Sequence, residues 1–456
     1  MKTRNKLSRR DAIKAMGIGS ASLFLSTSTQ AKTKLSQPAS HKKVKIVIAG
    51  GGTGGMIAAA RLRRSAPNAD ITVISPNATH LYQPGQTFVA AGLYIQDDNE
   101  RKTAELLEDK VEWLQESIIA FHPKNNFVTT DKSGNISYDY LVVALGVEYN
   151  YEAIEGLTKE IIGKNGIASV YLNDTKNGTA QGGDITHQWL KKIQHHAAEK
   201  KTKILCTEPN TPIKGVGTSL NILFLGNDIF RGKAPFSKRN VIKNIQWNFS
   251  KADDTLFPFE KFNTVIEKKI KQEKNITPLY EHQLQAVDVK KKIATFFSNG
   301  RKVDIAYDFL HVVPPMQAPK VFRNSPLALQ HGKYRGYMDV DEKTLRHKQY
   351  KNVFGLGDIL GINLAKTGGS AQEQAVVIQD NLAAAIENKP LPIEYNGYTV
   401  APIKMNFGEV LLAEFNEKEA LPTFWLNPYK PRWIWWELDL HVMRKAYFSL
   451  MMRGML

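Results

Sequence analysis

Short apolar runs that end in glycine or polar residues recur along the chain and predict buried parallel strands. The first run, at 45–49, leads directly into a stretch of glycines, and an alanine-rich segment follows at 58–64. A second apolar run is found at 70–75. Since a buried strand, a helix and another strand in this order form a βαβ unit, the chain begins with the pattern of a parallel sheet.

Later segments repeat this pattern and predict an α/β protein. A strand pattern ends in glycine at 136–146, and an amphipathic helix at 187–201 precedes a strand at 202–207. Further strands are predicted at 240–246, 293–297, 309–313 and 352–356, and a long helix continues to residue 385. With 456 residues, the chain is long enough for two to three domains.

The glycines after the first strand fit a dinucleotide-binding fingerprint. Gly50, Gly52 and Gly55 occupy the glycine positions of Gly-x-Gly-x-x-Gly between a strand and a helix. The first glycine permits a tight turn, the second lets the backbone approach a pyrophosphate, and the third lets the helix pack on the strand. The N–H groups at the helix start, at Thr53 and Gly54, then face the phosphates. An ordinary glycine-rich turn is the alternative interpretation.

Three further residues are predicted to contact the same ligand. Ser75 ends the second strand, about 20 residues beyond the glycines, where an acidic side chain normally binds a ribose hydroxyl. Gln83 lies in a loop at the carboxyl end of that strand, the edge at which open α/β sheets bind ligands. Gly146 ends the apolar run of 136–146, a position that commonly closes a flavin domain.

A second group of polar residues follows the last predicted strand. Gly357 and Asp358 end the run at 352–356, and Lys366 and Thr367 precede a helix that starts with small residues. The Asp358 carboxylate can accept hydrogen bonds from ribityl hydroxyls, or it can cap a helix instead. The helix start after Lys366 carries a partial positive charge that suits the electron-rich pyrimidine edge of a reduced flavin. These four residues are therefore predicted to bind the cofactor.

The sequence argues against several other chemistries. Gly215 and Gly217 form only half of a second fingerprint, which disfavours a second nicotinamide site. The single cysteine, Cys206, lies in a predicted strand and excludes an intrachain disulfide or a redox-active pair. The histidines show no metal-binding spacing, so we expect no metal site. We expect no nucleic-acid binding, because no recognisable binding motif is present.

The first 31 residues have the order of an export signal. Arg9 and Arg10 precede a modestly apolar segment at 15–25, and small residues lead to a cleavage position after Ala31. The paired arginines predict the twin-arginine route, which exports proteins already folded around a cofactor. We therefore expect a periplasmic protein; a disordered basic tail is the alternative. Removal of residues 1–31 takes a net +5 from the formal charge of +17, and the remaining +12 suits anionic lipid headgroups or an acidic partner.

The C-terminal residues predict an amphipathic helix with an aromatic face. Its apolar side chains at helical spacing are Trp433, Trp436, Leu440, Met443 and Tyr447. With basic residues beside it, such a face suits a helix at a membrane surface, where it would meet a lipid-soluble electron acceptor. Packing on the protein's own core is the alternative. No apolar run approaches the roughly 18 residues that span a bilayer.

Taken together in chain order, these motifs resemble the sulfide:quinone oxidoreductase family of flavoproteins. The resemblance runs from about Lys43 to the C-terminus. Its motifs are the fingerprint at 50–55 and the segments at 80–84, 140–146, 209–214, 313–316, 352–358, 366–367, 395–399 and 452–454. So many matches in the same order make the resemblance specific.

The resemblance implies an α/β fold with two Rossmann-like dinucleotide-binding domains, the first of them discontinuous, and C-terminal amphipathic helices. After the signal peptide at 1–31, which the N-terminal residues themselves predict, the implied parts are an FAD-binding domain at 44–150 and 321–395, a second Rossmann-like domain at 151–320, and a membrane- and quinone-associated region at 396–456. It also implies FAD as the cofactor, quinone as the electron acceptor and a small molecule, sulfide in this family, as the donor. The oligomeric state, including a homo-oligomer, stays open.

Two positions depart from the family's pattern. The family carries one redox cysteine directly after Pro-x-Lys and another after Gly-Asp, and this chain has Gly215 and Ile359 there. Because the family's chemistry needs a thiolate to take up sulfide sulfur, no residue is assigned as catalytic. Three functions follow: an FAD-dependent oxidoreductase that passes electrons from a small donor to quinone, a flavoprotein subunit of the flavocytochrome c type, or a non-catalytic flavin-binding or electron-transfer homologue.

Overall fold

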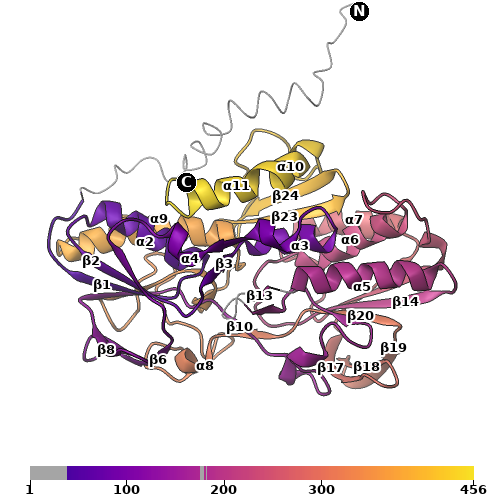
Figure 1. Cartoon of the computed structure of the whole chain (residues 1–456), viewed down its shortest axis with the longest axis horizontal. Coiled ribbons are helices and arrows are strands. Elements are labelled where there is room, and N and C mark those ends of the chain that lie inside the picture. The colour runs from indigo at the N-terminus through magenta and orange to yellow at the C-terminus, as the bar shows by residue number, and fades with distance from the viewer. Residues whose placement is uncertain (1–38, 175–178, 181) are drawn as a thin grey trace, which may run out of the picture.

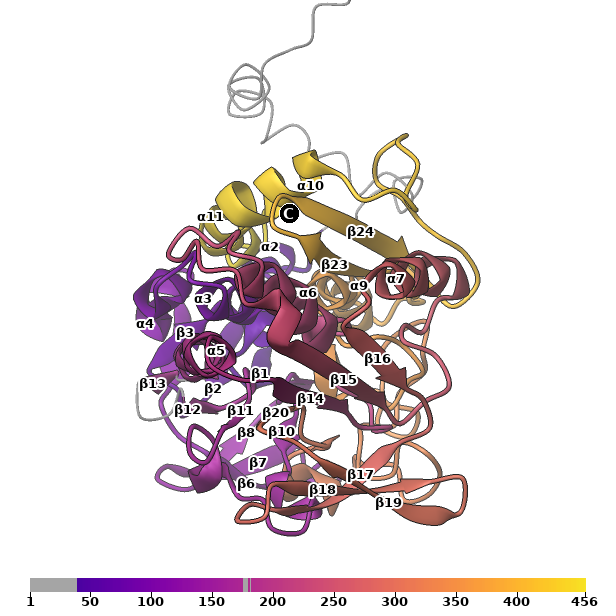
Figure 2. The ribbon, with the colours of Figure 1, turned by 90° about the vertical axis from the view of Figure 1, so that its right-hand side faces the viewer.

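Two parallel sheets form the body of the protein, and the C-terminal elements lie along one side of both (Figures 1 and 2). The computed structural model describes residues 39–174, 179–180 and 182–456. The predicted signal peptide at 1–31 therefore lies outside the described residues. Two small antiparallel sheets lie on the side opposite the C-terminal elements (Figure 1).

The first sheet is assembled from distant parts of the chain. Its five parallel strands run in the order β22-β9-β1-β2-β5. They are β1 (Lys45–Ala49), β2 (Asp70–Ile74), β5 (Val111–Leu114), β9 (Tyr140–Val143) and β22 (Val353–Gly355). Helices α2 (Thr53–Ser65) and α9 (Gly368–Ile386) pack against each other and contact this sheet. Since β22 and α9 return to the sheet that β1 begins, the discontinuous Rossmann-like unit is confirmed.

The second sheet repeats the parallel architecture with strands in the order β11-β20-β14-β15-β16. They are β11 (Ile167–Ala168), β14 (Thr202–Glu208), β15 (Ile245–Lys251), β16 (Ile276–Leu279) and β20 (Phe309–Val312). Its helices are α5 (Gly182–Ala197), α6 (Thr218–Phe230) and α7 (Glu260–Gln272). The strand predicted at 240–246 lies later, in β15, because Trp247 and Phe249 supply its fully buried positions. The predicted α/β fold class with two Rossmann-like units is thus confirmed.

Cys206 lies within β14 and is completely buried. Burial raises the pKa of its thiol far above the ordinary value, since a thiolate would lose its hydration there. The residue therefore packs as a small hydrophobic side chain.

Short elements complete the fold. One small sheet contains β6 (Ile118–His122), β7 (Phe127–Thr130) and β8 (Gly134–Ser137), and the other contains β17 (Gln283–Asp288), β18 (Ile293–Ser298) and β19 (Arg301–Ala306). Two-stranded pairs are β3 (Thr79–Leu81) with β4 (Glu100–Lys102), β10 (Glu148–Tyr149) with β21 (Met316–Gln317), and β12 (Asn173–Asp174) with β13 (Thr179–Ala180). The short helices are α3 (Gln86–Ala90), α4 (Thr103–Leu106) and α8 (Lys320–Arg323).

The C-terminal region consists of a hairpin and a helix. In the hairpin, β23 (Thr399–Asn406) pairs with β24 (Glu409–Phe415), and β23 packs against α6 and α9. The helix runs through α10 (Trp433–Glu437), a π-helical turn at Leu438–Met443, α11 (Arg444–Ala446) and a second π-helical turn at Tyr447–Met451. The predicted C-terminal helix is therefore present, with two turns wider than an α-helix.

The predicted aromatic face of this helix is divided between the core and the surface. Trp436 and Tyr447 are buried at 6% and 5% exposure, against the protein itself. Trp433, Leu440 and Met443 are only half-buried. Two of the five side chains of the predicted face, Trp436 and Tyr447, therefore pack on the protein's own core. None of the described helices combines the length and the apolar character needed to cross a membrane.

Candidate functional site

The glycine-rich turn between β1 and α2 needs glycine at two positions for steric reasons. Gly50 has a left-handed backbone with φ of +113°, and a Cβ there would overlap the carbonyl oxygen of Ala144, the residue directly after β9. A Cβ on Gly55 would overlap the Gly50 carbonyl oxygen. These are the turn and close-packing roles of the first and third fingerprint glycines.

The middle of the turn is open, as a bound pyrophosphate requires. A Cβ added to Gly52 would meet no atom within 4 Å, and Gly52 itself is exposed. Gly52 is the N-cap of α2 and makes no side-chain hydrogen bond there, so no capping side chain accepts a hydrogen bond from the first-turn N–H groups around Thr53 and Gly54. The open turn and these donors fit the phosphates of a dinucleotide.

The other residues predicted around this ligand lie at the same edge of the sheet. Ser75 is buried against the turn, and a Cβ on Gly51 would lie 2.9 Å from the Ser75 Oγ. Gln83 is exposed at the start of a 3₁₀ turn, Gln83–Gly85. Gly146 has a left-handed backbone with φ of +69° and open space where a Cβ would be.

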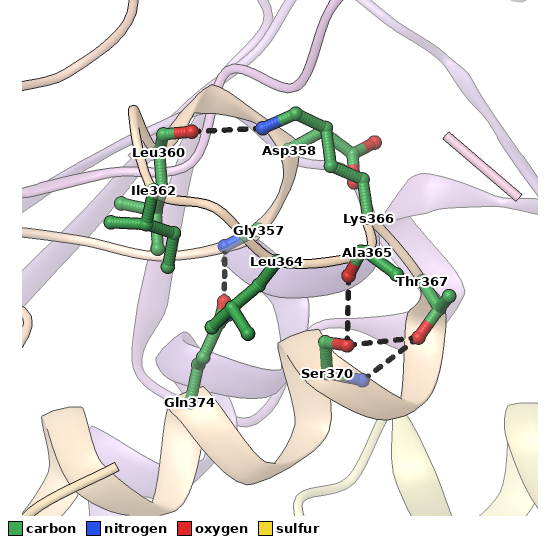
Figure 3. Close-up of a pocket in the computed structure, with 10 residues that line it drawn as sticks. All are labelled: Gly357, Asp358, Leu360, Ile362, Leu364, Ala365, Lys366, Thr367, Ser370 and Gln374. Atoms are coloured by element: carbon green, nitrogen blue, oxygen red, sulfur yellow. Dashed lines mark hydrogen bonds between the residues drawn. The ribbon is translucent and has the colours of Figure 1, made fainter. Parts of the chain in front are cut away.

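A small pocket lies where β22 ends and α9 begins (Figure 3). It is lined by Gly357, Asp358, Leu360, Ile362, Leu364, Ala365, Lys366, Thr367, Ser370 and Gln374. The sequence-predicted residues of the second polar group are thus brought together on one cavity. No hydrogen bond from the described residues is made to the Asp358 carboxylate, which lies within a 3₁₀ turn and caps no described helix.

Lys366 is the one buried cation among the residues that line this pocket. Its Nζ donates a hydrogen bond to the Leu360 carbonyl oxygen at 2.8 Å (Figure 3). The same Nζ lies 4.7 Å from the centre of the Tyr337 ring. Burial lowers the pKa of Lys366 to about 8, while the nearby Asp358 carboxylate acts in the opposite direction. The side chain therefore carries its charge at neutral pH in a position where water cannot screen it well.

Two residues of α9 that the sequence did not single out shape this pocket. The Gln374 Oε1 accepts a hydrogen bond from the Gly357 N–H at 2.7 Å. The Ser370 N–H donates to the Thr367 Oγ1 at 3.2 Å, so Thr367 acts as the N-cap of α9. Ser370 and Gln374 come four and eight residues after Lys366. This spacing indicates a shared site only once the position of the pocket is known.

The two positions at which the family pattern has cysteine differ in environment. Gly215 lies beside the pocket, since its N–H donates to the Lys366 carbonyl oxygen at 2.7 Å. It has a left-handed backbone with φ of +72°, and a Cβ would lie 2.8 Å from the Thr218 Oγ1. Ile359 is completely buried in the core around the first sheet, although its neighbours Asp358 and Leu360 line the pocket.

The corresponding turn of the second sheet, before α6, is closed by the C-terminal hairpin. A Cβ on Gly217 would overlap the Ile403 Cδ1 of β23 and would approach Phe257 at 3.8 Å. At the same edge, Lys251 pairs with the buried Glu208, which also accepts a hydrogen bond from Ser219. The backbone of this turn is thus packed directly against the C-terminal hairpin at Gly217.

The glycine turn of the first sheet also contacts the C-terminal helix. The Tyr447 hydroxyl oxygen lies 2.7 Å from the Thr53 Oγ1 and 2.6 Å from the His80 Nε2. The sequence placed His80 in a motif and Tyr447 on an aromatic face, but it gave no sign that the two side chains meet.

Fold and site together define a flavoprotein oxidoreductase with FAD as its cofactor. Residues 44–182 match the family model described as pyridine nucleotide-disulphide oxidoreductase. The chain is 32% identical over 415 residues to the mitochondrial sulfide:quinone oxidoreductase of Dictyostelium discoideum, which covers 90% of this chain and 86% of that protein. The chain therefore belongs to the sulfide:quinone oxidoreductase family.

Solved structures agree with this fold. The sulfide:quinone oxidoreductase of Aquifex aeolicus aligns with a TM-score of 0.69 at 19% identity, over 89% of this chain and 90% of that one. One chain from the mitochondrial ATP synthase structure of Tetrahymena thermophila aligns with a TM-score of 0.74 at 16% identity, over 92% and 99% of the two chains. At these identities the likeness concerns the fold alone.

Proposed function

We propose that this chain is an exported, FAD-dependent oxidoreductase that passes electrons from a small donor to membrane quinone. The names of the relatives supply sulfide as the donor and quinone as the acceptor. The observation that carries the proposal is the buried Lys366 ammonium group at the pocket. A fixed cation at this place stabilises the negative charge that a flavin gains on reduction.

The chain offers residues for each part of the cofactor. The open turn at Gly52 and the start of α2 at Thr53 would hold the pyrophosphate. The Asp358 carboxylate would accept hydrogen bonds from ribityl hydroxyls. Bound FAD supplies the two-electron redox chemistry between donor and acceptor. Lys366 keeps a proton on Nζ below about pH 8 and so holds a positive charge at the ring end of the site.

The proposed donor reacts without a relay through protein thiols. Gly215 and Ile359 stand at the relay positions, and Cys206 is fully buried inside β14. No thiolate of this chain is therefore available to take up sulfur. Electron transfer from the donor has to occur directly at the cofactor site beside Gly215.

Peripheral attachment to the membrane is the proposed route to quinone. Trp433 and Met443 stay partly exposed on the C-terminal helix, and Trp425 in the preceding loop is 95% exposed. Lys430 and Arg432 lie close to them in sequence. Aromatic and basic side chains in one region favour a position on an anionic membrane surface. Together with the twin-arginine signal, this supports the periplasmic face of the membrane.

The missing cysteines favour a second candidate function. A flavoprotein subunit of the flavocytochrome c type would pass its electrons to a protein, and a non-catalytic homologue would bind flavin without turnover. Gly215 has no side chain and Ile359 is part of the core, so neither position presents a group that could replace the thiol. This observation is compatible with a chain that has lost sulfide chemistry and kept its cofactor.

Anaerobic flavin bleaching distinguishes these functions. Purified holoprotein is mixed with sulfide and, in a separate sample, with NADH, and a soluble quinone is then added. We expect sulfide to bleach the flavin, NADH to leave it oxidised, and quinone to restore the oxidised spectrum. A flavin that dithionite reduces and sulfide does not would rule out sulfide as the donor and favour the second function.

A further inference from the structure

A continuous line of hydrogen bonds joins the C-terminal helix to the dinucleotide-binding turn. The Tyr447 hydroxyl lies within hydrogen-bonding distance of both Thr53 and His80, and the His80 Nδ1 lies 3.3 Å from the Gly51 carbonyl oxygen. Tyr447 and His80 are both buried, at 5% and 4% exposure. The four residues of this line come from the turn and the start of α2, from β3 and from the C-terminal helix.

The direction of each hydrogen bond follows from the chemistry of the groups. The Gly51 carbonyl can only accept, so the proton of the neutral His80 ring is on Nδ1. The His80 Nε2 then accepts from the Tyr447 hydroxyl, and the Tyr447 oxygen accepts from the Thr53 hydroxyl. Burial lowers the pKa of His80 to about 4, which keeps the ring neutral at ordinary pH. One arrangement therefore satisfies every donor in the line.

Helix α2, which follows the dinucleotide-binding turn, also binds the last residues of the chain. Arg64 donates from Nη1 to the Gly454 carbonyl oxygen at 2.8 Å, and Arg61 donates to the Leu456 carbonyl oxygen. Arg453 in turn donates to the Leu107 carbonyl oxygen at 3.0 Å. The C-terminal residues 447–456 thus contact both the start and the end of α2. The second π-helical turn of the C-terminal helix starts at Tyr447. Such turns are rare and are found frequently at functional sites.

We propose that the C-terminal helix is a latch on the dinucleotide-binding turn, with Tyr447 as the positioning residue, so that FAD binding and docking of residues 433–456 stabilise each other. If the docked helix fixes the turn in the shape that FAD binds, then bound FAD must favour the docked helix by the same free energy. The proposal rests on FAD binding alone. It does not depend on the donor or on quinone, so its failure is distinct from a failure of the proposed function.

The first test measures how fast FAD leaves the holoprotein. In Tyr447→Phe the ring stays and both hydrogen bonds of the hydroxyl are lost. We expect FAD to dissociate about five- to tenfold faster, in the range set by one or two buried hydrogen bonds. Tyr94→Phe is the matched control, because the Tyr94 hydroxyl donates to the Leu440 carbonyl of the same helix without reaching the turn. An equal rate of FAD release from the two variants would contradict a specific role of Tyr447.

The second test needs no variant and covers the case in which Tyr447→Phe does not fold. Hydrogen–deuterium exchange of the amides in 444–452 is compared between the wild-type holoprotein and the same protein after FAD removal. We expect bound FAD to slow exchange in this segment, although the turn that binds FAD, at 50–55, lies near the other end of the sequence. If exchange at 444–452 is the same with and without FAD, the two sites are not coupled and the proposal is wrong.

Discussion

Lys366 combines a functional role with a cost to folding. Its pKa falls from 10.5 in the unfolded chain to about 8 in the fold, because burial disfavours the charged amine. At about 1.4 kcal/mol for each pKa unit, this corresponds to about 3 kcal/mol of lost stability at neutral pH. A fold that keeps such a residue at the pocket does so for its charge, which suits a site that stabilises a reduced flavin.

We predict that Lys366→Met stabilises the protein without cofactor by about 1 to 3 kcal/mol at pH 7, measured by urea denaturation. Between about pH 8 and 10.5 the unfolded lysine binds a proton that the folded one has released. Wild-type stability therefore rises with pH in this window, and the difference between the two proteins shrinks.

In the holoprotein, Lys366→Met should weaken function instead of improving it. Without the Lys366 cation the reduced flavin is less stable, so the reduction potential of the variant falls. Lys351→Met, at an exposed position, is the control and should change neither quantity. A Lys366→Met variant that is less stable than wild type at pH 7 would contradict this account of the residue.

Gly215→Cys is predicted not to restore a thiol relay. The backbone there is left-handed, a Cβ would lie 2.8 Å from the Thr218 Oγ1, and the second relay position, Ile359, is in the core. We expect a loss of about 1 to 2 kcal/mol in the free energy of unfolding and no faster flavin reduction by sulfide. Gly215→Ala separates strain from thiol chemistry and should be destabilised equally. Faster reduction by sulfide in the cysteine variant alone would show that the site still accepts the family's mechanism.

Single residues were predictable where a local pattern fixes their role. Gly50 and Gly55 follow from the fingerprint, because strand, turn and helix are contiguous in sequence and the steric demand is local. His80, Gln374 and Tyr447 were not assigned to the site. Each acts through a partner far away in the sequence, and only the folded arrangement brings the pair together.

Among the elements, the C-terminal helix is fixed to the hairpin by a buried ion pair. The Lys404 Nζ of β23 lies 3.1 Å from the Asp439 Oδ2, and both side chains are at most 6% exposed. The Lys404 ammonium also lies 4.6 Å from the centre of the Phe88 ring. The contact thus joins the hairpin, α3 and the first π-helical turn.

We predict that Lys404→Met lowers the free energy of unfolding by about 3 to 5 kcal/mol, because it leaves the Asp439 carboxylate buried without its cation. The double variant Lys404→Met with Asp439→Leu removes both charges and should recover most of that loss. Urea denaturation of the four proteins of this cycle measures the coupling. Additive losses in the double variant would mean that the pair does not act as a unit.

Strands and helices with a strong periodic pattern were predictable, and short polar elements were not. β1, α2, β2, β14 and α9 lie close to their predicted positions, since their buried residues follow the period of the element. β6, β7 and β8 carry mixed polar and apolar residues in four- or five-residue strands, too short for a clear period. The C-terminal helix was predictable from its spacing, but its partial burial depends on the hairpin beneath it.

At the scale of the whole molecule, the two α/β units differ in the turn that follows a strand and precedes a helix, before α2 in the first unit and before α6 in the second. The turn of the first sheet is open at Gly52, whereas Ile403 and Phe257 fill the space at Gly217 in the second. The first sheet therefore presents an open turn, and the second packs its turn against the C-terminal hairpin. We expect NADH to leave the flavin oxidised because the second fingerprint, at Gly215 and Gly217, is incomplete.

The discontinuous arrangement of the first sheet was inferred from family resemblance and not from periodicity. A strand such as β22 has the same local pattern whichever sheet it joins, so its pairing with β9 is a property of the complete chain. The departures at Gly215 and Ile359 came from the same comparison with the family's motifs. The structure adds that the left-handed backbone at Gly215 would strain a residue with a side chain, including cysteine.

Reoxidation of the reduced holoprotein tests the central claim most directly, because it does not depend on the donor. The flavin is reduced photochemically without oxygen and then mixed rapidly with a soluble quinone or, in a parallel sample, with a c-type cytochrome. An oxidoreductase that delivers electrons to quinone should recover its oxidised spectrum quickly with quinone and slowly with the cytochrome. The reverse order, or slow reoxidation by both acceptors, would contradict the proposed function.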